Sequence, residues 1–282
     1  MNDFISSKKY LTIGAFSKLS GINRKNLIYY DNVGILKPVF VKENGYRYYS
    51  YSQLDEVSII LALKDLDIPL KKIKNYMENV SPHNLINLIT DQKQKILEEL
   101  NRLNQMNYII EQRTSNIPVI SNISCDKIFL ENCKQELLFL GPEMKFDIEN
   151  FEKDFISFID YSKSKKLVYG YPLGVYLDYD GAIEDSIKTY RYFYKVSQNV
   201  NVEKTIKPAG LYVITYDNSY LAEDMKNFDK LNEFIENNHL NICGSVYIEN
   251  MSDEIITKNP NKYYSKISVK VKKLDDRVTL PY

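Results

Sequence analysis

The sequence predicts an α+β protein with more than one domain, and three observations support that class. Two short amphipathic helical patterns near the N-terminus are separated by a break at Ser20-Gly21. A longer helical pattern covers residues 81–116. From residue 117 onward, short β-type runs alternate with two helical stretches. The chain has 282 residues, which is long enough for at least two hydrophobic cores.

The composition is that of a globular protein, with 44% hydrophobic and 26% charged residues. We find no run of 18 or more apolar residues and no apolar N-terminal stretch of signal-peptide length, so we expect no membrane partner and a cytoplasmic location. The net charge is zero, yet residues 1–80 hold 12 Lys and Arg against 8 Asp and Glu, and the remainder holds 25 against 29. A basic first domain on an acidic body suggests that the first domain binds phosphates.

The first domain that we expect, residues 1–80, has the order of a winged helix-turn-helix, in which one helix enters the major groove of DNA. Thr12 is placed to cap the first helix, as Asn23 is for the second. The basic, aromatic hairpin that follows turns at Asn44-Gly45. The side chains that we expect to contact double-stranded DNA come from the cap, the second helix, the hairpin and the third helix: Thr12, Arg24, Lys25, Tyr29, Tyr30, Arg47, Tyr48 and Lys64.

The same segment resembles the MerR family of transcription regulators. The matching pieces, in the family's order, are Thr12–Gly14, Tyr29–Asp31, Gly34–Pro38, Tyr46–Tyr49 and Leu63–Leu70 followed by Lys72-Ile73. The family usually has an arginine directly before the paired tyrosines, where this chain has Ile28, so one expected DNA contact is absent. The resemblance implies a homodimer that distorts promoter DNA and thereby activates transcription by RNA polymerase.

The second domain that we expect, residues 81–116, is a long helix with an apolar seam. Its members recur at spacings of 3 and 4 with one polar position among them: Leu85, Ile89, Gln92, Ile96, Leu100, Leu103 and Ile110. Such a seam fits a two-helix coiled coil, or an amphipathic helix packed within one subunit. The resemblance implies the first, an antiparallel coiled coil that pairs two chains.

The third domain that we expect, residues 117–282, reads as two similar halves that face each other across a cleft, each with strands around one helix. Its weaker motifs resemble the GyrI-like effector domain of multidrug sensors of the BmrR type: Gly141–Glu143, Tyr169-Gly170, Thr189–Arg191, Pro208–Tyr212 and Val246-Tyr247. In that family, aromatic rings line a cleft that holds small, flat, cationic molecules. The matching positions for such a ligand are Phe151, Tyr169, Tyr190, Tyr216 and Tyr264.

The main departure from the family lies at the base of the cleft. Relatives carry a glutamate directly after Val-Tyr, where this chain has Ile248, and Glu249 follows one residue later. A one-residue offset along a strand turns a side chain to the opposite face. Either a bulge brings Glu249 into the cleft, or the buried counter-charge is missing and preference shifts toward neutral or zwitterionic aromatic ligands, with Glu143 and Asp178 as substitutes. Both Ile248 and Glu249 are therefore ligand-site candidates.

Two alternative functions remain open. Cys125 and Cys133 follow the long helix with seven residues between them, where metal-responsive relatives place cysteines, so a metal- or redox-responsive regulator is one alternative. Some isolated GyrI-like domains are similar to small hydrolases, so residual hydrolase activity is the other. The chain has only two histidines, His83 and His239, and no phosphate loop, zinc spacing or nucleophile motif. We therefore predict no enzyme, no catalytic residue, no cofactor and no bound metal.

Overall fold

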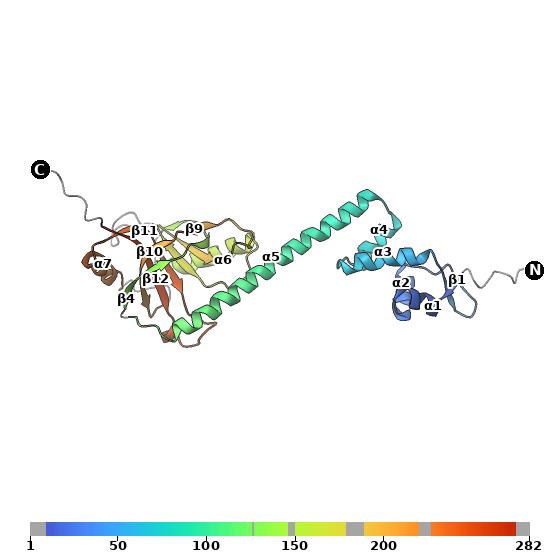
Figure 1. Cartoon of the computed structure of the whole chain (residues 1–282), viewed down its shortest axis with the longest axis horizontal. Helices are drawn as coiled ribbons and strands as arrows, with labels where there is room; N and C mark the ends of the chain where they lie inside the picture. The colour runs from blue at the N-terminus through green and yellow to red at the C-terminus, as the bar shows by residue number, and fades with distance from the viewer. Residues whose placement is uncertain (1–9, 126, 146–149, 179–188, 220–226, 275–282) are drawn as a thin grey trace, which may run out of the picture. The chain divides into compact units, whose positions relative to one another are not determined.

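The computed structural model describes residues 10–125, 127–145, 150–178, 189–219 and 227–274 (Figure 1). The chain divides into two compact units, residues 1–98 and 99–282. One long helix, α5 (Pro82–Ile120), begins in the first unit and ends in the second. Among the described residues, no helix is both long enough and apolar enough to span a membrane.

The first unit combines a three-stranded sheet, in the order β1-β3-β2, with short helices. The bounds are β1 (Tyr10–Thr12), α1 (Ile13–Ser20), α2 (Arg24–Val33), β2 (Phe40–Val41), β3 (Arg47–Ser50), α3 (Gln53–Asp65) and α4 (Leu70–Glu78). Both predicted caps are confirmed: Thr12 Oγ1 accepts from the Ala15 amide at 3.3 Å, and Asn23 Oδ1 accepts from the Asn26 amide at 2.8 Å. Gly21, with φ of 75°, ends α1 and allows the tight turn between α1 and α2.

Buried aromatic residues hold the wing, the hairpin of β2 and β3, against the helices. The rings of Phe16 and Tyr49 stack with centroids 4.5 Å apart, which joins α1 to β3. Gln53 anchors the start of α3, because its side chain accepts from the Ser50 amide at 3.1 Å and donates to the Lys37 carbonyl at 2.7 Å. The core of this unit therefore positions the surface of α2 and the wing together.

Helix α5 continues beyond the predicted end at residue 116. Pro118 lies in its last turn, where the missing amide removes a single backbone hydrogen bond. Side chains bind the carbonyls near that end, with Ser121 Oγ donating to Ile117 at 3.1 Å and Asn122 Nδ2 donating to Pro118 at 3.0 Å. The helix consequently ends at Ile120, after the proline, rather than before it.

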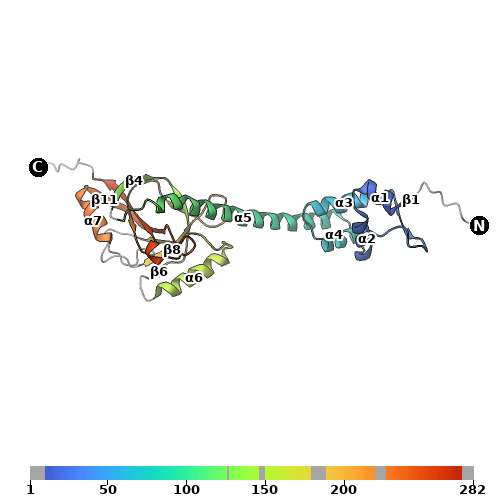
Figure 2. The same ribbon diagram turned by 90° about the horizontal axis from the view of Figure 1, so that it is seen from below.

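The second unit contains one sheet, which has nine strands among the described residues, in the order β4-β10-β12-β11-β7-β8-β5-β9 with β6 beside β8. The elements are β4 (Ile128–Cys133), β5 (Glu136–Leu140), β6 (Met144–Lys145), α6 (Phe151–Ser164), β7 (Gly174–Leu177), β8 (Thr189–Lys195), β9 (Thr205–Lys207), β10 (Gly210–Asp217), α7 (Asn227–Asn237), β11 (Leu240–Asn250), the 3₁₀ turn Pro260–Lys262 and β12 (Ser265–Lys273). Both helices flank this sheet (Figure 2).

The strand order confirms the predicted pseudo-symmetry of this unit. One half runs β5-α6-β7-β8 and the other runs β10-α7-β11-β12. In the sheet order β10-β12-β11-β7-β8-β5, each half places its first strand outermost, its third strand next and its second strand at the centre. The two halves meet where β7 pairs with β11. The strand that precedes each half crosses to the other, because β4 pairs with β10 and β9 pairs with β5.

The sheet is strongly curled. Lys207 on β9 contacts Glu249 on β11, although β5, β8 and β7 lie between those strands in the sheet order. The face that carries these two side chains is called the concave face below. Helices α6 and α7 cover the opposite face, where Phe158 and Leu231 pack with strand residues such as Ile248. The concave face has its own buried cluster, composed of Leu138, Phe193, Tyr212, Ile214 and Tyr247.

Candidate functional site

The first turns of α2 present basic side chains to solvent. Arg24 and Lys25 are exposed, and Tyr29 follows on an exposed part of the same helix. The Arg24 guanidinium lies against Gly14 of α1, so closely that a Cβ at position 14 would lie 2.6 Å from Arg24 Nη2. Gly14 thus gives room for the arginine at the N-terminal end of α2, where recognition helices read base edges.

Burial disfavours one of the predicted DNA contacts, Tyr30. Tyr30 is only 2% exposed and packs in the core of the first unit, three residues after the fully buried Leu27. Since residues three apart share a helix face, the inward position of Leu27 requires Tyr30 to point inward too. Thr12 and Lys64 are both exposed, although the Thr12 hydroxyl is engaged as the helix cap.

The wing is tied to the end of α2 by an ion pair. Arg47 Nε donates to Asp31 Oδ2 at 2.8 Å, which leaves the other guanidinium nitrogens for a phosphate. Tyr48 stacks on Phe40 with centroids 4.9 Å apart, and Lys42 Nζ lies 5.1 Å from the centroid of the Tyr48 ring. Sequence reasoning missed Phe40 and Lys42, although pairing across a hairpin that turns at Asn44-Gly45 would have placed them beside Tyr48.

Among the cavities that the described residues form, no single one is lined by all of the predicted ligand-binding rings. The single aromatic cleft stays a prediction. Phe151 and Tyr190 contact each other with centroids 5.0 Å apart, but Tyr190 is buried and its hydroxyl donates to Asp154 Oδ2 at 2.8 Å. Tyr216 lines a separate hollow beside Phe129. Tyr264 joins the loop before β12, where its backbone carbonyl accepts from the Met251 amide. The sequence alone carries no signal for which of these rings lie close together in the folded chain.

Tyr169 lies on a groove of about 340 Å³ that has an aromatic lining and an acidic edge. This residue is 75% exposed. The rings of Tyr171 and Tyr194 stack nearby with centroids 5.2 Å apart. The rest of the lining comes from α5, α6, the β7 approach and the loop after β11: Arg113, Phe155, Ile159, Gly170, Leu173, Asp253, Glu254 and Ile255.

Helix α5 reaches this groove through Arg113. The Arg113 guanidinium binds both carboxylate oxygens of Asp253 at 3.0 Å, and its Nε donates to the Gly170 carbonyl at 2.9 Å. Gln105 lies about two helical turns before Arg113 on α5. Its side chain accepts from the Val168 amide at 2.8 Å and donates to the Lys166 carbonyl at 3.1 Å. The groove is therefore attached to α5 by hydrogen bonds on both sides of Tyr169.

Ile248 and Glu249 occupy opposite faces of β11. The strand has an irregularity between Ile242 and Val246, but alternation is regular from Val246 onward. Ile248 is buried under the helices, while Glu249 is buried on the concave face with Tyr247. Glu249 is therefore a buried carboxylate on the concave face, whereas Ile248, where the resemblance led us to expect the glutamate, faces the helices.

The proposed substitutes do not replace a buried carboxylate. Glu143 is exposed and accepts from Arg191 Nη2 at 2.9 Å. Asp178 is also exposed and accepts from the Tyr176 hydroxyl at 3.4 Å. Both carboxylates remain at the surface, so neither is a buried counter-charge.

Glu249 belongs to a closed ring of four charges on the concave face. Lys207 Nζ lies 2.6 Å from Glu249 Oε1 and 3.0 Å from Glu136 Oε2. Lys195 Nζ lies 2.6 Å from Glu249 Oε2 and 3.1 Å from Glu136 Oε1. Each lysine thus bridges both glutamates, and the net charge of this ring is zero. The four residues come from β5, β8, β9 and β11, so sequence reasoning had no local signal for their proximity.

The ring shifts the protonation equilibria of its members. Burial alone would raise the pKa of Glu249, but the ammonium groups of Lys195 and Lys207 outweigh burial and hold that pKa well below its usual range. Burial lowers the pKa of both lysines, and the facing carboxylates of Glu249 and Glu136 more than reverse this, so the pKa values are raised. Glu249, Lys195 and Lys207 are therefore charged at neutral pH.

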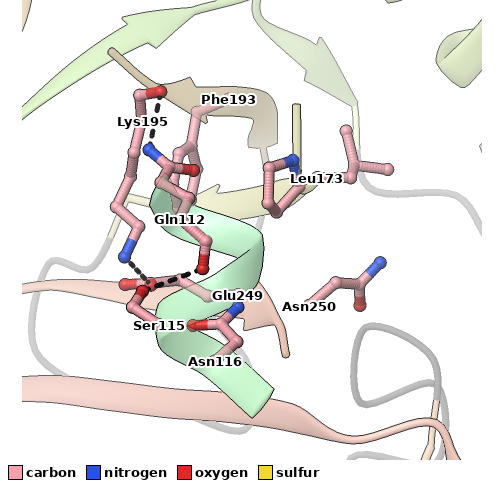
Figure 3. A pocket seen from close by; sticks show the side chains of 9 residues that line it. Gln112, Ser115, Asn116, Leu173, Phe193, Lys195, Glu249 and Asn250 are labelled. Carbon is pink, nitrogen blue, oxygen red and sulfur yellow. Dashed lines mark hydrogen bonds and ion pairs between the residues drawn. The ribbon is translucent and has the colours of Figure 1, made fainter. Parts of the chain in front are cut away.

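The charge ring borders a small cavity against α5 (Figure 3). About 40 Å³ is free there, which is room for a few water molecules. Gln112 Nε2 donates to the Lys195 carbonyl at 3.2 Å, and Figure 3 shows the Lys195 ammonium reaching Glu249 beside Ser115 and Asn116. This cavity is too small for an aromatic ligand in its present form.

The cysteine positions give the metal-responsive alternative no support. Cys125 precedes β4 and Cys133 ends it. Within the described ranges, no group of three or more His, Cys, Asp or Glu side chains is placed to hold a metal ion. Burial raises the pKa of the Cys133 thiol, which disfavours the thiolate that a soft metal requires.

The exposed basic helix and wing, together with a separate pseudo-symmetric unit on the same long helix, define a DNA-binding regulator that carries an effector domain. Residues 11–80 match the model of the MerR HTH family regulatory proteins. Along nearly its whole length, the chain is also 30% identical over 275 residues to the multidrug-efflux transporter 2 regulator of Bacillus subtilis, covering 95% of this chain and 98% of that protein. The chain belongs to the MerR family of transcription regulators.

Two further similarities cover most of the chain. The multidrug-efflux transporter 1 regulator of Bacillus subtilis is 25% identical over 262 residues, covering 85% of this chain and 90% of that protein. The cryo-EM structure of the EcmrR-DNA complex is 18% identical, with a TM-score of 0.42, and covers 94% of this chain and all of that one. The curated relatives are transcription regulators, in agreement with the prediction that the chain is not an enzyme.

Proposed function

We propose that this chain is a homodimeric transcription activator controlled by small, aromatic, cationic compounds. The observation that carries the proposal is the groove at Tyr169, because it joins an aromatic lining to an acidic edge and touches α5. The two Bacillus subtilis relatives are regulators of multidrug-efflux transporters, which supports a drug or dye as the effector.

The groove has the size and chemistry for such an effector. Its volume of about 340 Å³ lies at the lower end of the roughly 300–1,000 Å³ typical of small-molecule sites. Tyr169, Tyr171 and Tyr194 offer ring faces that attract cations. The Tyr171 hydroxyl is buried and has no hydrogen-bond partner within the described part of the chain, so a polar ligand atom would satisfy it.

Arg113 supplies a route from the groove to α5. A cationic ligand would compete with the Arg113 guanidinium for the Asp253 carboxylate, and would thereby change how α5 docks on the effector domain. A ligand shifts a conformational equilibrium only through its differential affinity for the two states. Competition for Asp253 provides that difference in affinity, because the carboxylate is available to a ligand only in the state in which Arg113 has released it.

A dye titration tests the groove. We expect Tyr169→Ala to weaken binding of a cationic aromatic dye by about tenfold, since ring–cation contact and stacking contribute about 1–2 kcal/mol. Tyrosine fluorescence of the full-length chain reports binding, and an uncharged analogue of the dye reports charge preference. Tyr51→Ala, which removes an exposed ring of the first unit, is the matched control. Equal affinity of both variants for the dye would remove the groove from the proposal, and preferential binding of the uncharged analogue would contradict the cationic class.

The remaining parts of the proposal follow the family. The boundaries 1–80, 81–116 and 117–282 separate DNA binding, dimerisation and effector binding, and the protein acts in the cytoplasm. We infer that promoter distortion makes RNA polymerase a partner. Arg24, Lys25, Tyr29, Arg47 and Tyr48 are the DNA contacts that exposure and position in the first unit support best.

Restoring the family's arginine tests the DNA surface. Ile28 is 37% exposed on α2, between the basic first turn and the wing contact at Asp31. We expect Ile28→Arg to tighten binding to the promoter of the chain's own gene several-fold and to steepen the salt dependence by about one phosphate contact. Fluorescence anisotropy at several salt concentrations measures both quantities. Ile28→Gln, with a similar length and no charge, is the control, and an equal salt slope for the two variants would contradict a phosphate contact at this position.

A further inference from the structure

The guanidinium of Arg24 on α2 occupies the space that a side chain at Gly14 of α1 would need. A Cβ added at position 14 would lie 2.6 Å from Nη2, 3.2 Å from Cζ and 3.4 Å from Nε of Arg24. Real Cβ atoms essentially never have neighbours within 3.0 Å, so any side chain at position 14 would displace the guanidinium. The guanidinium ends a long and flexible side chain, so it can move without disturbing either helix.

The charge of Arg24 is not neutralised by the protein. Residues 1–80 contain two arginines, and Arg47 is paired with Asp31 at 2.8 Å. In the part of the chain that the structure describes, no carboxylate pairs with Arg24, and neither α1 nor α2 has an acidic residue in its first turn. Arg24 is also exposed, so its guanidinium is available to an external anion.

The direction of the Arg24 side chain indicates which anion it meets. In a helix-turn-helix, the second helix enters the major groove and the first helix crosses the sugar–phosphate backbone. Arg24 begins α2, yet its guanidinium lies on the first turn of α1, the helix that crosses the backbone. A guanidinium can donate two parallel hydrogen bonds to phosphate oxygens, and such contacts fix the register of a protein on DNA without reading its sequence.

We propose that Arg24 binds a phosphate of the DNA backbone, and that Gly14 is the positioning residue that lets the guanidinium lie on α1. The proposal rests on the DNA-binding surface proposed above, and it assigns Arg24 to affinity rather than to operator sequence. Ile28, where the family usually has an arginine, follows one helical turn after Arg24 on the same side of α2. Arg24 therefore supplies a positive charge on the side of α2 that lacks the family's arginine.

A double-mutant cycle in the full-length chain tests both residues by fluorescence anisotropy at several salt concentrations. We expect Arg24→Ala to weaken binding several-fold, equally on the promoter of the chain's own gene and on an unrelated duplex of the same length. The slope of log affinity against log salt should fall by about one phosphate contact per DNA-binding domain.

Gly14→Ala should reproduce both changes, because its methyl group displaces the Arg24 guanidinium. Its Tm should equal or exceed that of the native chain, since alanine favours a helix more than glycine does. In an Arg24→Ala background, Gly14→Ala should weaken binding no further. In a Lys25→Ala background it should keep its full effect, because Lys25 is exposed on the same turn of α2 and has no contact with Gly14.

Each outcome decides a separate step. A loss confined to the promoter, with an unchanged salt slope, would make Arg24 a base contact and overturn the proposal. A native-like Gly14→Ala chain, or an effect of Gly14→Ala that persists without Arg24, would overturn the positioning role. An Arg24→Ala chain that binds both duplexes like the native chain would remove Arg24 from the DNA-binding surface proposed above, whereas the other failures leave that surface in place.

Discussion

Replacing Glu249 with glutamine is expected to destabilise the C-terminal unit by about 3–5 kcal/mol, because breaking a buried ion pair leaves its partners without compensation. The buried ammonium of Lys207 and the partly buried ammonium of Lys195 would then share only the Glu136 carboxylate. Their mutual repulsion adds to the cost of keeping them away from water. Glutamine preserves the shape of the side chain, so the change isolates the charge rather than the packing.

Thermal unfolding measures this effect. For a unit of this size, roughly 2–4 °C of Tm corresponds to each kcal/mol, so we expect Glu249→Gln to lower the Tm by roughly 6–20 °C. Glu233→Gln is the matched control, since Glu233 is an exposed glutamate on α7. A Tm within a degree or two of the control would mean that water or neighbouring groups compensate the lysines, which would contradict a dry charge ring.

The pH dependence of stability gives a second measurement of the same ring. Glu249 has a lowered pKa, so its contribution is complete above the ordinary value of 4.5 and is lost as pH falls toward the pKa of the folded state. The groups that face it are Glu136, Lys195, Lys207 and Lys266. Lys195 and Lys207, whose pKa values the carboxylates raise, stay protonated over that range. We therefore expect acid to destabilise the native chain more steeply below pH 4.5 than it destabilises Glu249→Gln.

Local chemistry explains why much of the first unit was predictable from the sequence. The caps at Thr12 and Asn23 and the turn at Asn44-Gly45 depend on side chains and dihedral angles within a few residues. The burial of Tyr30 could also be predicted from the sequence, because the helical period places Tyr30 on the same face as Leu27. Its assignment as a DNA contact stays a prediction that this burial does not favour.

The effector domain was predictable only at the level of its elements and their two-fold repetition. Alternation along β11 correctly implied that Ile248 and Glu249 face opposite ways, but it did not show what covers each face. The partners of Glu249 lie 42, 54 and 113 residues away in the sequence, on strands that the curl of the sheet brings together. Ring positions transferred from relatives likewise carried no information on exposure, which separates Tyr169 from Tyr190.

The second large effect is expected at the seam of α5. Ile96, Leu100 and Leu103 are each about half exposed in the single chain, in line with one another at spacings of 3 and 4. An apolar stripe of this length on a soluble helix is a site of association, and a second copy of α5 would cover it by symmetry. A charge in the centre of the stripe must then be desolvated on dimerisation, which costs several kcal/mol.

We therefore expect Leu100→Glu to convert the proposed dimer into a monomer and to weaken operator binding by about 10²–10⁴-fold. A two-fold dimer binds two half-sites, and its second contact is intramolecular. Light scattering measures the mass, and anisotropy with promoter DNA measures affinity. Gln94→Glu adds the same charge on the opposite side of α5 and should leave both quantities unchanged. Circular dichroism separates loss of pairing from loss of the helix. A dimeric Leu100→Glu chain would place the interface elsewhere. A helical monomer that binds the operator weakly would establish that one DNA-binding domain alone binds weakly and that pairing through α5 supplies the affinity.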